Sequence, residues 1–271
     1  MIGLAKSTYH FKTKVAEREK RDLELREVID GIHAQFPGYG HRRIREHLRR
    51  SGRVVNKKRL RRVIAKYGLF PVVWRAFVAT TDSRHNLPIH DNLLGGLDVT
   101  MLNKVWVADL TYIRITTCFV YLAVILDLCS RKVIGWALSR NIDHALSMAA
   151  LTMALQDRQP PPGCIHHSDR GSQYACAAYV DLAKSAGMRI SMSAKGNPYD
   201  NAHAESFMKT LKYEEVHLWN YETYGDVLER VPYFLEEVYN KKRLHSSLGY
   251  LPPTEFEDTM DTVNAVPVLT L

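Results

Sequence analysis

The stretch that decides the fold is VWVADLTYIRITTCFVYLAVILDLCSRKVIGWAL, residues 105–138. Three apolar or alternating runs, rich in Val, Ile, Tyr and Trp, follow one another in it, and Cys129-Ser130-Arg131 separates the second run from the third. Short runs of β-branched and aromatic residues favour strands. The stretch therefore predicts three consecutive strands that pair as an antiparallel meander.

The residues that follow alternate between helix and strand patterns. A helical pattern over 143–157 stops at Pro160-Pro161-Pro162-Gly163, and CIHHSD (164–169) is a short apolar run typical of a strand. AAYVDLAKSAG (177–187) predicts a helix, and MRISMS (188–193) predicts a last strand. Three antiparallel strands followed by alternating helices and strands indicate an α/β fold, a mixed five-stranded sheet with helices on both faces.

The N-terminal part is helical and strongly basic. Between Arg42 and Lys66 there are twelve Lys or Arg residues and a single acid, Glu46. Apolar residues recur through the block at helical spacing, and Asn56 and Gly68 are suited to cap a last basic helix. Three short helices of this kind indicate a helix-turn-helix module, although a solvated basic face on a small bundle is the alternative. The candidate DNA contacts on the last helix are Lys57, Lys58, Arg59, Arg61, Arg62 and Lys66.

Composition bounds the class of protein. The net charge is +8 and the pI is near 9.3, which favours a polyanionic partner. No apolar run has the length of a membrane span or of a secretory signal, so we expect a cytoplasmic protein with four reduced cysteines and no membrane association. We predict a helical DNA-binding module at 1–75, a linker at 76–103, a sheet-based core with C-terminal helices at 104–258 and a tail at 259–271.

Three acids stand at different places in the predicted core. Asp109 lies within the first strand, Asp169 ends the fourth, and Glu205 lies on a helical pattern in NAHAESFMKTLKYE (201–214). Glu205 shares one helix face with Lys209 and Lys212, at i, i+4 and i+7. Any one of these acids alone is more often a cap or a surface charge, so only their joint placement carries weight.

The motifs WVADLTY, YLAVILDLCSRKVIGW, HHSDRGSQY and GNPYDNAHAESFMKTLKYE resemble the catalytic core of the DDE transposases of bacterial insertion sequences. The resemblance is closest to the group related to retroviral integrases, in which a second reading frame encodes the core. Thirty-five residues separate Asp169 from Glu205, the separation for which that superfamily is named. YGHRRIREHL upstream and YNKKRLHSSLGYLPPTEF downstream extend the match from about Phe36 to Phe256.

The resemblance implies an RNase H-like core and a magnesium-dependent transposase, with Mn²⁺ as a substitute metal. Asp109 would bridge two ions, Asp169 would bind one and Glu205 the other. Such an enzyme nicks the ends of its element and joins the exposed 3′-hydroxyl to target DNA, by two-metal phosphodiester transfer. We expect self-association on double-stranded DNA at the nucleoid. The start, MIGLAKSTYHF, resembles the junction downstream of another DNA-binding module that frameshifting often joins, so the chain is expected to be the second part of a fusion.

Alternatives remain open at several positions. The whole protein could instead be a catalytically silent DNA-binding or regulatory protein, or a structure-selective nuclease on the same fold. His166 and His167 allow a zinc site with His203 and Asp169, but by strand alternation one of the two should face the core. We assign Asp127 to a turn.

The remaining predictions concern contacts with DNA. Lys209 and Lys212 are candidate contacts beside the active site, against a solvated face that supports Glu205 by an ion pair. Arg243 contacts phosphate or packs, and GSQYA (171–175) is expected to be a mobile loop beside the substrate.

Overall fold

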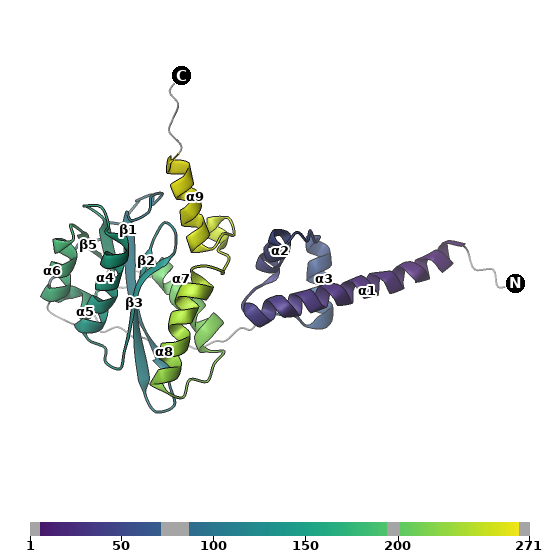
Figure 1. The fold of residues 1–271 in the computed structure, drawn as a ribbon, viewed down its shortest axis with the longest axis horizontal. Helices are drawn as coiled ribbons and strands as arrows, with labels where there is room; N and C mark the ends of the chain where they lie inside the picture. Colours follow the sequence, from purple (N-terminus) through teal and green to yellow (C-terminus); the bar gives the residue numbers. More distant parts are fainter. Residues whose placement is uncertain (1–5, 72–86, 194–200, 266–271) are drawn as a thin grey trace, which may run out of the picture. The chain divides into compact units, whose positions relative to one another are not determined.

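The computed structural model describes residues 6–71, 87–193 and 201–265. The chain forms two compact units, Met1–Trp74 and Arg75–Leu271. The first is helical and the second is built on a sheet (Figure 1). Each unit is treated by itself below.

The helical unit packs two short helices against the C-terminal half of a long one. Its helices are α1 (Lys6–Gln35), α2 (His41–Arg50) and α3 (Lys57–Tyr67). The buried side chains that join them include Ile29, Ile44, Leu48, Leu60 and Val63. As predicted, Asn56 caps α3 by accepting a hydrogen bond from the Lys58 N–H at 2.8 Å, and Gly68 ends the helix in the left-handed region.

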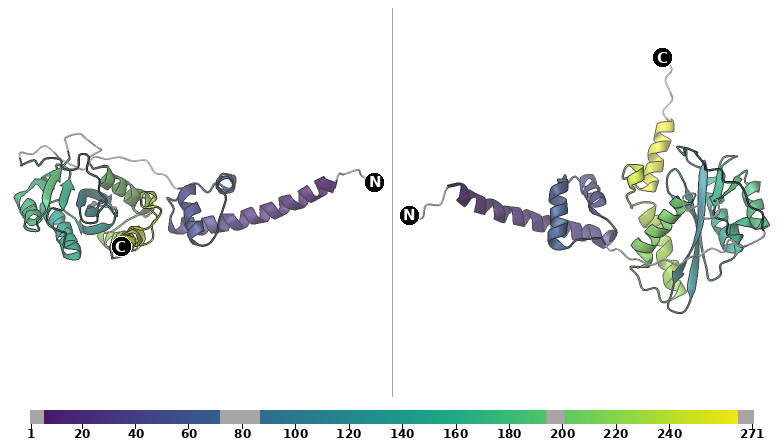
Figure 2. Two further views of the ribbon diagram at one scale, coloured as in Figure 1. Left: turned by 90° about the horizontal axis from the view of Figure 1, so that it is seen from above. Right: turned by 180° about the vertical axis from the view of Figure 1, so that it is seen from behind.

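The first helix is much longer than the short helix that the sequence predicted. It spans 30 residues, and its N-terminal half extends past α2 and α3 (Figures 1 and 2). The apolar pattern that predicted a short helix lies only where α1 packs, around Leu25, Ile29 and Ile32. Residues 15–21 of α1 are exposed, and periodicity reports burial, so it misses a helix segment of this kind.

The second unit contains the five-stranded mixed sheet that the sequence predicted. Its strands are β1 (Val105–Arg114), β2 (Phe119–Asp127), β3 (Val133–Ser139), β4 (Ile165–Ser168) and β5 (Arg189–Met192). Their order across the sheet is β3-β2-β1-β4-β5. The pairs β1–β2 and β2–β3 are antiparallel, whereas β1–β4 and β4–β5 are parallel. The longest strand, β1, is therefore central and joins the meander to the parallel half.

Helices cover both faces of this sheet (Figure 1). One face carries α4 (His144–Arg158), α5 (Ser172–Ala175) and α6 (Ala177–Ser185), and Trp106 and Ala108 of β1 point into its core. The other carries α7 (Ala202–Leu211) and α8 (Tyr224–Tyr233), and Val105 and Val107 point there. The remaining elements are the π-helical turns η1 (Lys212–Val216) and η2 (Phe234–Tyr239), the 3₁₀ turn η3 (Ser246–Leu248), and α9 (Pro253–Ala265).

Residues 87–103, which the sequence assigned to a linker, pack on the second unit. Leu93, Leu94, Leu97 and Val99 lie against the core that α7 also covers. The Leu93 N–H donates to the Ser191 hydroxyl of β5 at 2.9 Å. This segment therefore adds apolar cover to the sheet.

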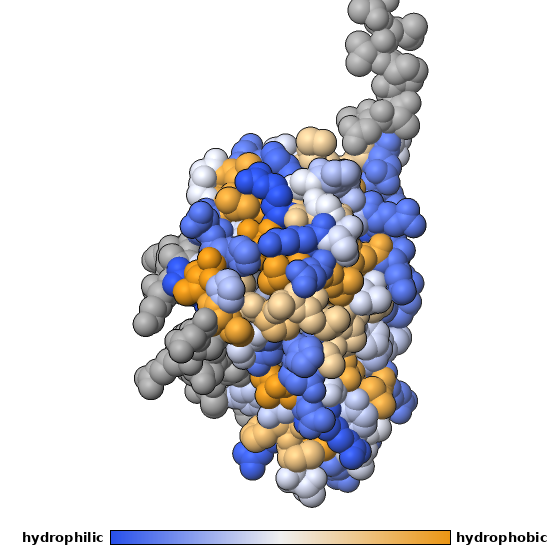
Figure 3. Space-filling view, turned by 90° about the vertical axis from the view of Figure 1, so that its left-hand side faces the viewer, coloured by the Kyte–Doolittle hydropathy of each residue, from blue (hydrophilic) through white to orange (hydrophobic). Residues whose placement is uncertain are grey.

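The described helices include none that combines the length and the apolar character needed to cross a membrane. On the face shown in Figure 3, hydrophobic residues lie in groups that hydrophilic residues separate.

Candidate active site and nucleic-acid interface

The pairing of β1 with β4 brings two of the predicted acids to the same place. Val107 pairs with His167 in parallel register. Asp109 and Asp169 each lie two residues further along the chain, so they occupy equivalent positions where the two strands part. Alternation along β1 sets Asp109 on the face of Val105 and Val107, the face that α7 covers. The Asp169 carboxylate accepts the Gly171 N–H at 2.8 Å, which holds it at the end of β4.

Helix α7 supplies the third acid. Its buried side carries Ala204, Phe207 and Leu211, which pack on the face of the sheet that holds Asp109. Glu205 lies in the first turn of the helix, where the helix dipole favours an anion, and its side chain is exposed. In the described part of the chain, no ion pair joins Glu205 to Lys209, its i+4 neighbour.

The electrostatics of Asp109 report that the three acids act on one another. Burial, and then the negative charge of Asp169, raise the pKa of Asp109 to about 8. A hydrogen bond from the Leu110 N–H, at 2.8 Å, opposes the shift, and the charge of Glu205 adds to it. Asp109 is thus the focus of a region of negative potential to which β1, the end of β4 and helix α7 each contribute one acid.

The donor set suits a hard divalent cation. It consists of carboxylate oxygens, which Mg²⁺ and Mn²⁺ prefer, and includes no thiolate or imidazole. Within the described ranges, however, no three His, Cys, Asp or Glu side chains lie close enough together to hold a metal ion. Mutual repulsion of like charges favours such separation, and a cation would relieve it.

The segment after Asp169 differs from its prediction. The loop expected at 171–175 is largely helical, because Ser172–Ala175 form α5. Tyr174 is buried there, and its pKa is raised by burial, by Tyr179 and by the charges of Asp169 and Asp109. Sequence reasoning missed this phenol near the acids. The signal was a large aromatic residue within an otherwise polar run.

Both histidines before Asp169 are buried in β4, where their rings contact side-chain hydroxyl groups. His166 Nε2 lies 2.6 Å from the Tyr179 hydroxyl, and burial lowers its pKa to about 3. The ring nitrogens of His167 lie 2.8 Å from the Ser191 hydroxyl and 3.1 Å from that of Ser193. These contacts account for both residues without zinc. Only one of the two was expected to face a core, but both are buried because helices cover both faces of β4.

Asp127 is confirmed as a turn residue. Its buried carboxylate accepts N–H groups of Asn103, Cys129 and Ser130, at 2.6–3.1 Å, and so closes the turn between β2 and β3.

The candidate DNA contacts of the sheet unit fall into two kinds. Lys209 is exposed on α7, as predicted for a ligand-facing residue. The Lys212 ammonium instead donates to the Tyr112 carbonyl of β1 and lies over that ring, 4.4 Å from its centroid, and burial lowers its pKa to about 8. Arg243 is buried and makes two hydrogen bonds of 2.7 Å to Glu214. Packing, the alternative weighed for Arg243, is therefore what the structure favours, because a guanidinium bound this way has no surface to offer phosphate.

Two arginines of α3 also form ion pairs within the helical unit. Asp22 of α1 is 1% exposed and bonds Arg62 at 2.6 Å and Arg59 at 3.3 Å. Burial raises the pKa of Asp22, but the hydrogen bonds and charges of the two arginines outweigh burial and hold the pKa below its ordinary value. These side chains thus fasten α3 to α1.

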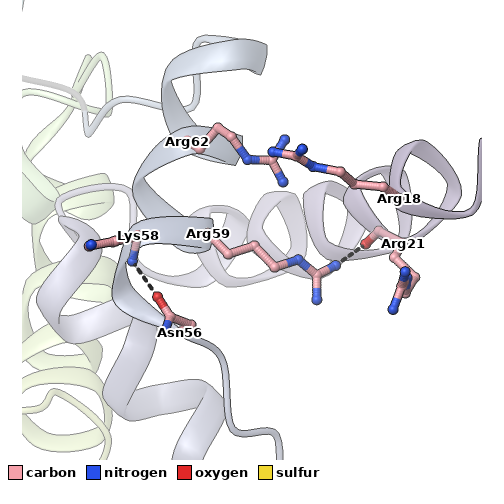
Figure 4. Close-up of a pocket in the computed structure, with 6 residues that line it drawn as sticks. All are labelled: Arg18, Arg21, Asn56, Lys58, Arg59 and Arg62. Carbon is pink, nitrogen blue, oxygen red and sulfur yellow. Dashed lines mark hydrogen bonds between the residues drawn. The ribbon is translucent and has the colours of Figure 1, made fainter. Parts of the chain in front are cut away.

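A basic hollow of about 460 Å³ lies beside this contact. Figure 4 shows the side chains of Arg18 and Arg62 pointing toward each other, with Arg59 donating to the Arg21 carbonyl at 2.6 Å. The hollow is lined by Arg18, Arg21, Asn56, Lys58, Arg59 and Arg62.

Comparisons with known proteins agree with this architecture. Residues 100–198 and 186–253 match models of the integrase core domain, and residues 20–77 match an HTH-like domain. The fold is similar to that of a chain in the simian T-cell lymphotropic virus intasome, with a TM-score of 0.50 and 14% identity over 90% of this chain and 76% of that one. The chain is thus an integrase-core protein with a helix-turn-helix-like unit.

Sequence relatives narrow the class. The chain is 37% identical to the Insertion element IS600 uncharacterized 31 kDa protein of Shigella sonnei, over 95% of this chain and 96% of that protein. It is 36% identical to the transposase for insertion sequence element IS904 of Lactococcus lactis, over 86% of this chain and 93% of that protein. The chain belongs to the family of insertion-sequence transposases, and the resemblance noted in its motifs is confirmed.

Proposed function

We propose that this chain nicks the ends of its insertion sequence and joins the released 3′-hydroxyl to target DNA, with Asp109, Asp169 and Glu205 as the catalytic acids. The observation that carries the proposal is the β1–β4 register, which sets Asp109 and Asp169 at equivalent positions where these strands part, with Glu205 in the first turn of α7. A cluster of carboxylates at a place where strands part costs stability, so a cation that binds there is the simplest reason for it.

The two reactions are the same displacement with different nucleophiles. In nicking, a water oxygen bonds to phosphorus and the bond to the 3′-oxygen of the element breaks, leaving a 3′-hydroxyl. In joining, that hydroxyl oxygen bonds to a target phosphorus, and the target's own 3′-oxygen leaves and takes up a proton. Two magnesium ions, when bound, would activate the attacking oxygen and stabilise the leaving one.

The chain's own residues have positioning roles in this proposal. Asp109 accepts a hydrogen bond from the Leu110 N–H and Asp169 accepts one from the Gly171 N–H, so the backbone fixes one oxygen of each carboxylate. Glu205 enters from α7 and is exposed, so it can move toward the other two at little cost. Lys209, exposed one turn further along α7, is suited to contact a phosphate beside the site.

Double-stranded DNA is the partner in this proposal, as element end and as target. The helical unit would bind it, and two or more copies would assemble on it, because two ends must be joined together. We expect the protein at the nucleoid when it is bound.

The test compares Glu205→Gln with Glu229→Gln. Glu229 is an exposed glutamate on α8, so its substitution makes the same change of charge away from the proposed site. Each full-length protein is incubated with labelled element-end duplex and Mg²⁺, with Mn²⁺, or with EDTA. We expect the wild type and Glu229→Gln to nick and join with either metal and not with EDTA. Glu205→Gln should lose both reactions while its DNA affinity persists or rises, because repulsion of phosphate falls.

Other outcomes point to other functions. Cleavage retained by Glu205→Gln removes this residue from the site. Nicks on any duplex without joined products indicate a nuclease. A shifted band with no cleavage in any metal indicates a DNA-binding protein without catalytic activity.

A further inference from the structure

The cations of the helical unit fall into two groups by their partners. The first group bonds acids of the same unit. Arg59 and Arg62 share Asp22, as described above, and Lys66 lies 3.6 Å from Glu19 of α1. Arg49 likewise bonds Glu46 within α2, at 2.6 Å. The charge of each of these cations is therefore at least partly compensated within the fold.

The second group surrounds His41, the first residue of α2. We call it the cation cluster, and it comprises Arg42, Arg45, Lys57 and Arg61. All four are exposed, and within the described ranges none forms a salt bridge with an acid, although the charge of Arg45 acts on Glu46. Burial lowers the pKa of His41, and the charges of these four residues lower it further, so all four lie near one imidazole.

The geometry of two packed helices explains why the cluster forms. Arg45 lies three residues after Arg42 on α2, and Arg61 lies four residues after Lys57, the first residue of α3. Residues three or four apart share a helix face, so each helix presents one cationic edge, and the two edges meet at the helix starts. Helix starts carry partial positive charge from unpaired N–H groups, which adds to the same potential.

A hollow of about 630 Å³ lies along this edge. It runs from Arg45 and Arg49 of α2, past the turn at Val54–Asn56, to Lys57 and Lys58 of α3. One acid, Glu46, also lines it, but that carboxylate is bonded to Arg49. The hollow therefore offers space for an anion beside two members of the cation cluster, Arg45 and Lys57.

We propose that the cation cluster is the surface of the helical unit that contacts the phosphate backbone of duplex DNA, and that Arg59, Arg62 and Lys66 chiefly hold α1 against α3. The proposal rests on the proposed function, and it assigns the two roles among residues that the sequence alone treats alike. Like charges gathered at one edge repel one another, and a polyanion relieves that repulsion.

The basic hollow between α1 and α3 is the competing surface. It contains Arg18 and Arg21, but two of its other cations share the buried Asp22. Neutralising Arg59 or Arg62 would therefore leave a buried carboxylate with one partner fewer. The residues of the cation cluster form no salt bridge with a buried acid within the described ranges.

The experiment measures the affinity of the full chain for a short duplex of mixed sequence as a function of salt. The variant Arg45→Gln/Arg61→Gln removes two cluster cations. The control, Arg26→Gln/Lys66→Gln, removes two cations that pair with Asp30 and Glu19. Each phosphate contact contributes about 0.9 to the slope of log affinity against log salt, so the cluster variant should lower that slope by about two. The control should lower it by less than about one, and thermal unfolding should show that both variants fold.

Each other result has a definite reading. Equal slopes for the cluster variant and the wild type overturn the proposal. A larger loss in Arg18→Gln/Arg21→Gln than in the cluster variant means that DNA runs along the α1–α3 hollow, and also overturns it. So does a cluster variant that binds DNA normally but no longer binds phosphatidylserine vesicles. If the salt slopes change as expected but neither the wild type nor any variant nicks or joins DNA, the proposed function is wrong. The assignment of the cation cluster to DNA binding then still holds.

Discussion

The two units treat their charges in opposite ways. The sheet unit places Asp109 on the covered face of β1, where burial and the charges of Asp169 and Glu205 raise its pKa to about 8. The helical unit leaves its cation cluster exposed, where water screens the repulsion. The buried acid therefore lowers the stability of the fold but produces a strong local electrostatic potential. Each exposed cation costs the fold little stability and produces only a weak potential. In the proposed function, this difference suits a site that holds metal ions and a surface that releases DNA.

The comparison makes its largest prediction at Asp109. Asp109→Asn should lower nicking and joining at least about a thousandfold, because a neutral amide cannot replace a carboxylate that holds cations. Without metal, the same variant should be more stable than the wild type. The folded pKa lies above the ordinary 3.8, so the folded state keeps a proton that the unfolded chain releases. Wild-type stability should therefore fall as pH rises from about 4 through about 8, and the variant should escape that loss. Urea unfolding in EDTA across this range measures both.

Asp127→Asn is the matched control for Asp109→Asn. Asp127 is also buried, but it accepts three backbone N–H groups, which an amide with one oxygen cannot all satisfy. This variant should be less stable than the wild type at every pH and still nick DNA once folded. An Asp109→Asn variant that is less stable than the wild type at every pH would contradict the prediction that burial and like charges make the Asp109 carboxylate destabilising.

A second prediction concerns the one fully buried arginine among the candidate DNA contacts. Arg243→Gln leaves Glu214 without its partner in a site where both side chains are below a tenth exposed. Loss of one member of a buried pair costs about 3 kcal/mol of unfolding free energy. Urea unfolding should show this loss, and the salt slope of DNA binding should not change.

Lys209→Gln is the contrasting variant. Its side chain is exposed, so stability should change by less than about 0.5 kcal/mol, whereas nicking should slow. If Arg243→Gln keeps its stability and lowers the salt slope, Arg243 contacts DNA and the assignment to packing is wrong.

These cases indicate which features could be predicted from sequence. The strands could be predicted because alternation along β1 reports two covered faces, and the short runs at β4 and β5 report burial. The three acids could be proposed because their flanking motifs resemble a known family. Their approach to one another depends on the β1–β4 register, which no local pattern specifies.

The roles of the cations could not be predicted because their partners are distant in sequence. Asp22 lies 40 residues before Arg62, and Glu214 lies 29 before Arg243. Within the basic block, Arg59 and Arg61 have similar neighbours, yet they point to different helices. Helix periodicity predicts that they differ in direction, but only the packing of α1 decides which direction contains an acid.

The smallest effect is expected at His41. It tests whether phosphate binds to the exposed cation cluster of the helical unit. Burial keeps the pKa of this imidazole below 6.5, and the charges of Arg42 and Arg45 on α2 and of Lys57 and Arg61 on α3 lower it further. A phosphate bound to the cation cluster would cancel part of that field and raise the pKa of His41 in the complex. Because the complex then binds protons more tightly than the free protein does, DNA affinity should rise as pH falls below about 6.5.

The rise in affinity should be a few-fold, since it reflects one proton on an exposed surface. His41→Gln should abolish the rise, whereas His33→Gln, which removes a histidine bonded to the Tyr39 carbonyl, should keep it. Duplex binding measured at fixed salt from pH 5.5 to 8 gives the comparison. A pH dependence that survives in His41→Gln would mean that phosphate does not reach this imidazole, and the cations around it would then be a solvated edge.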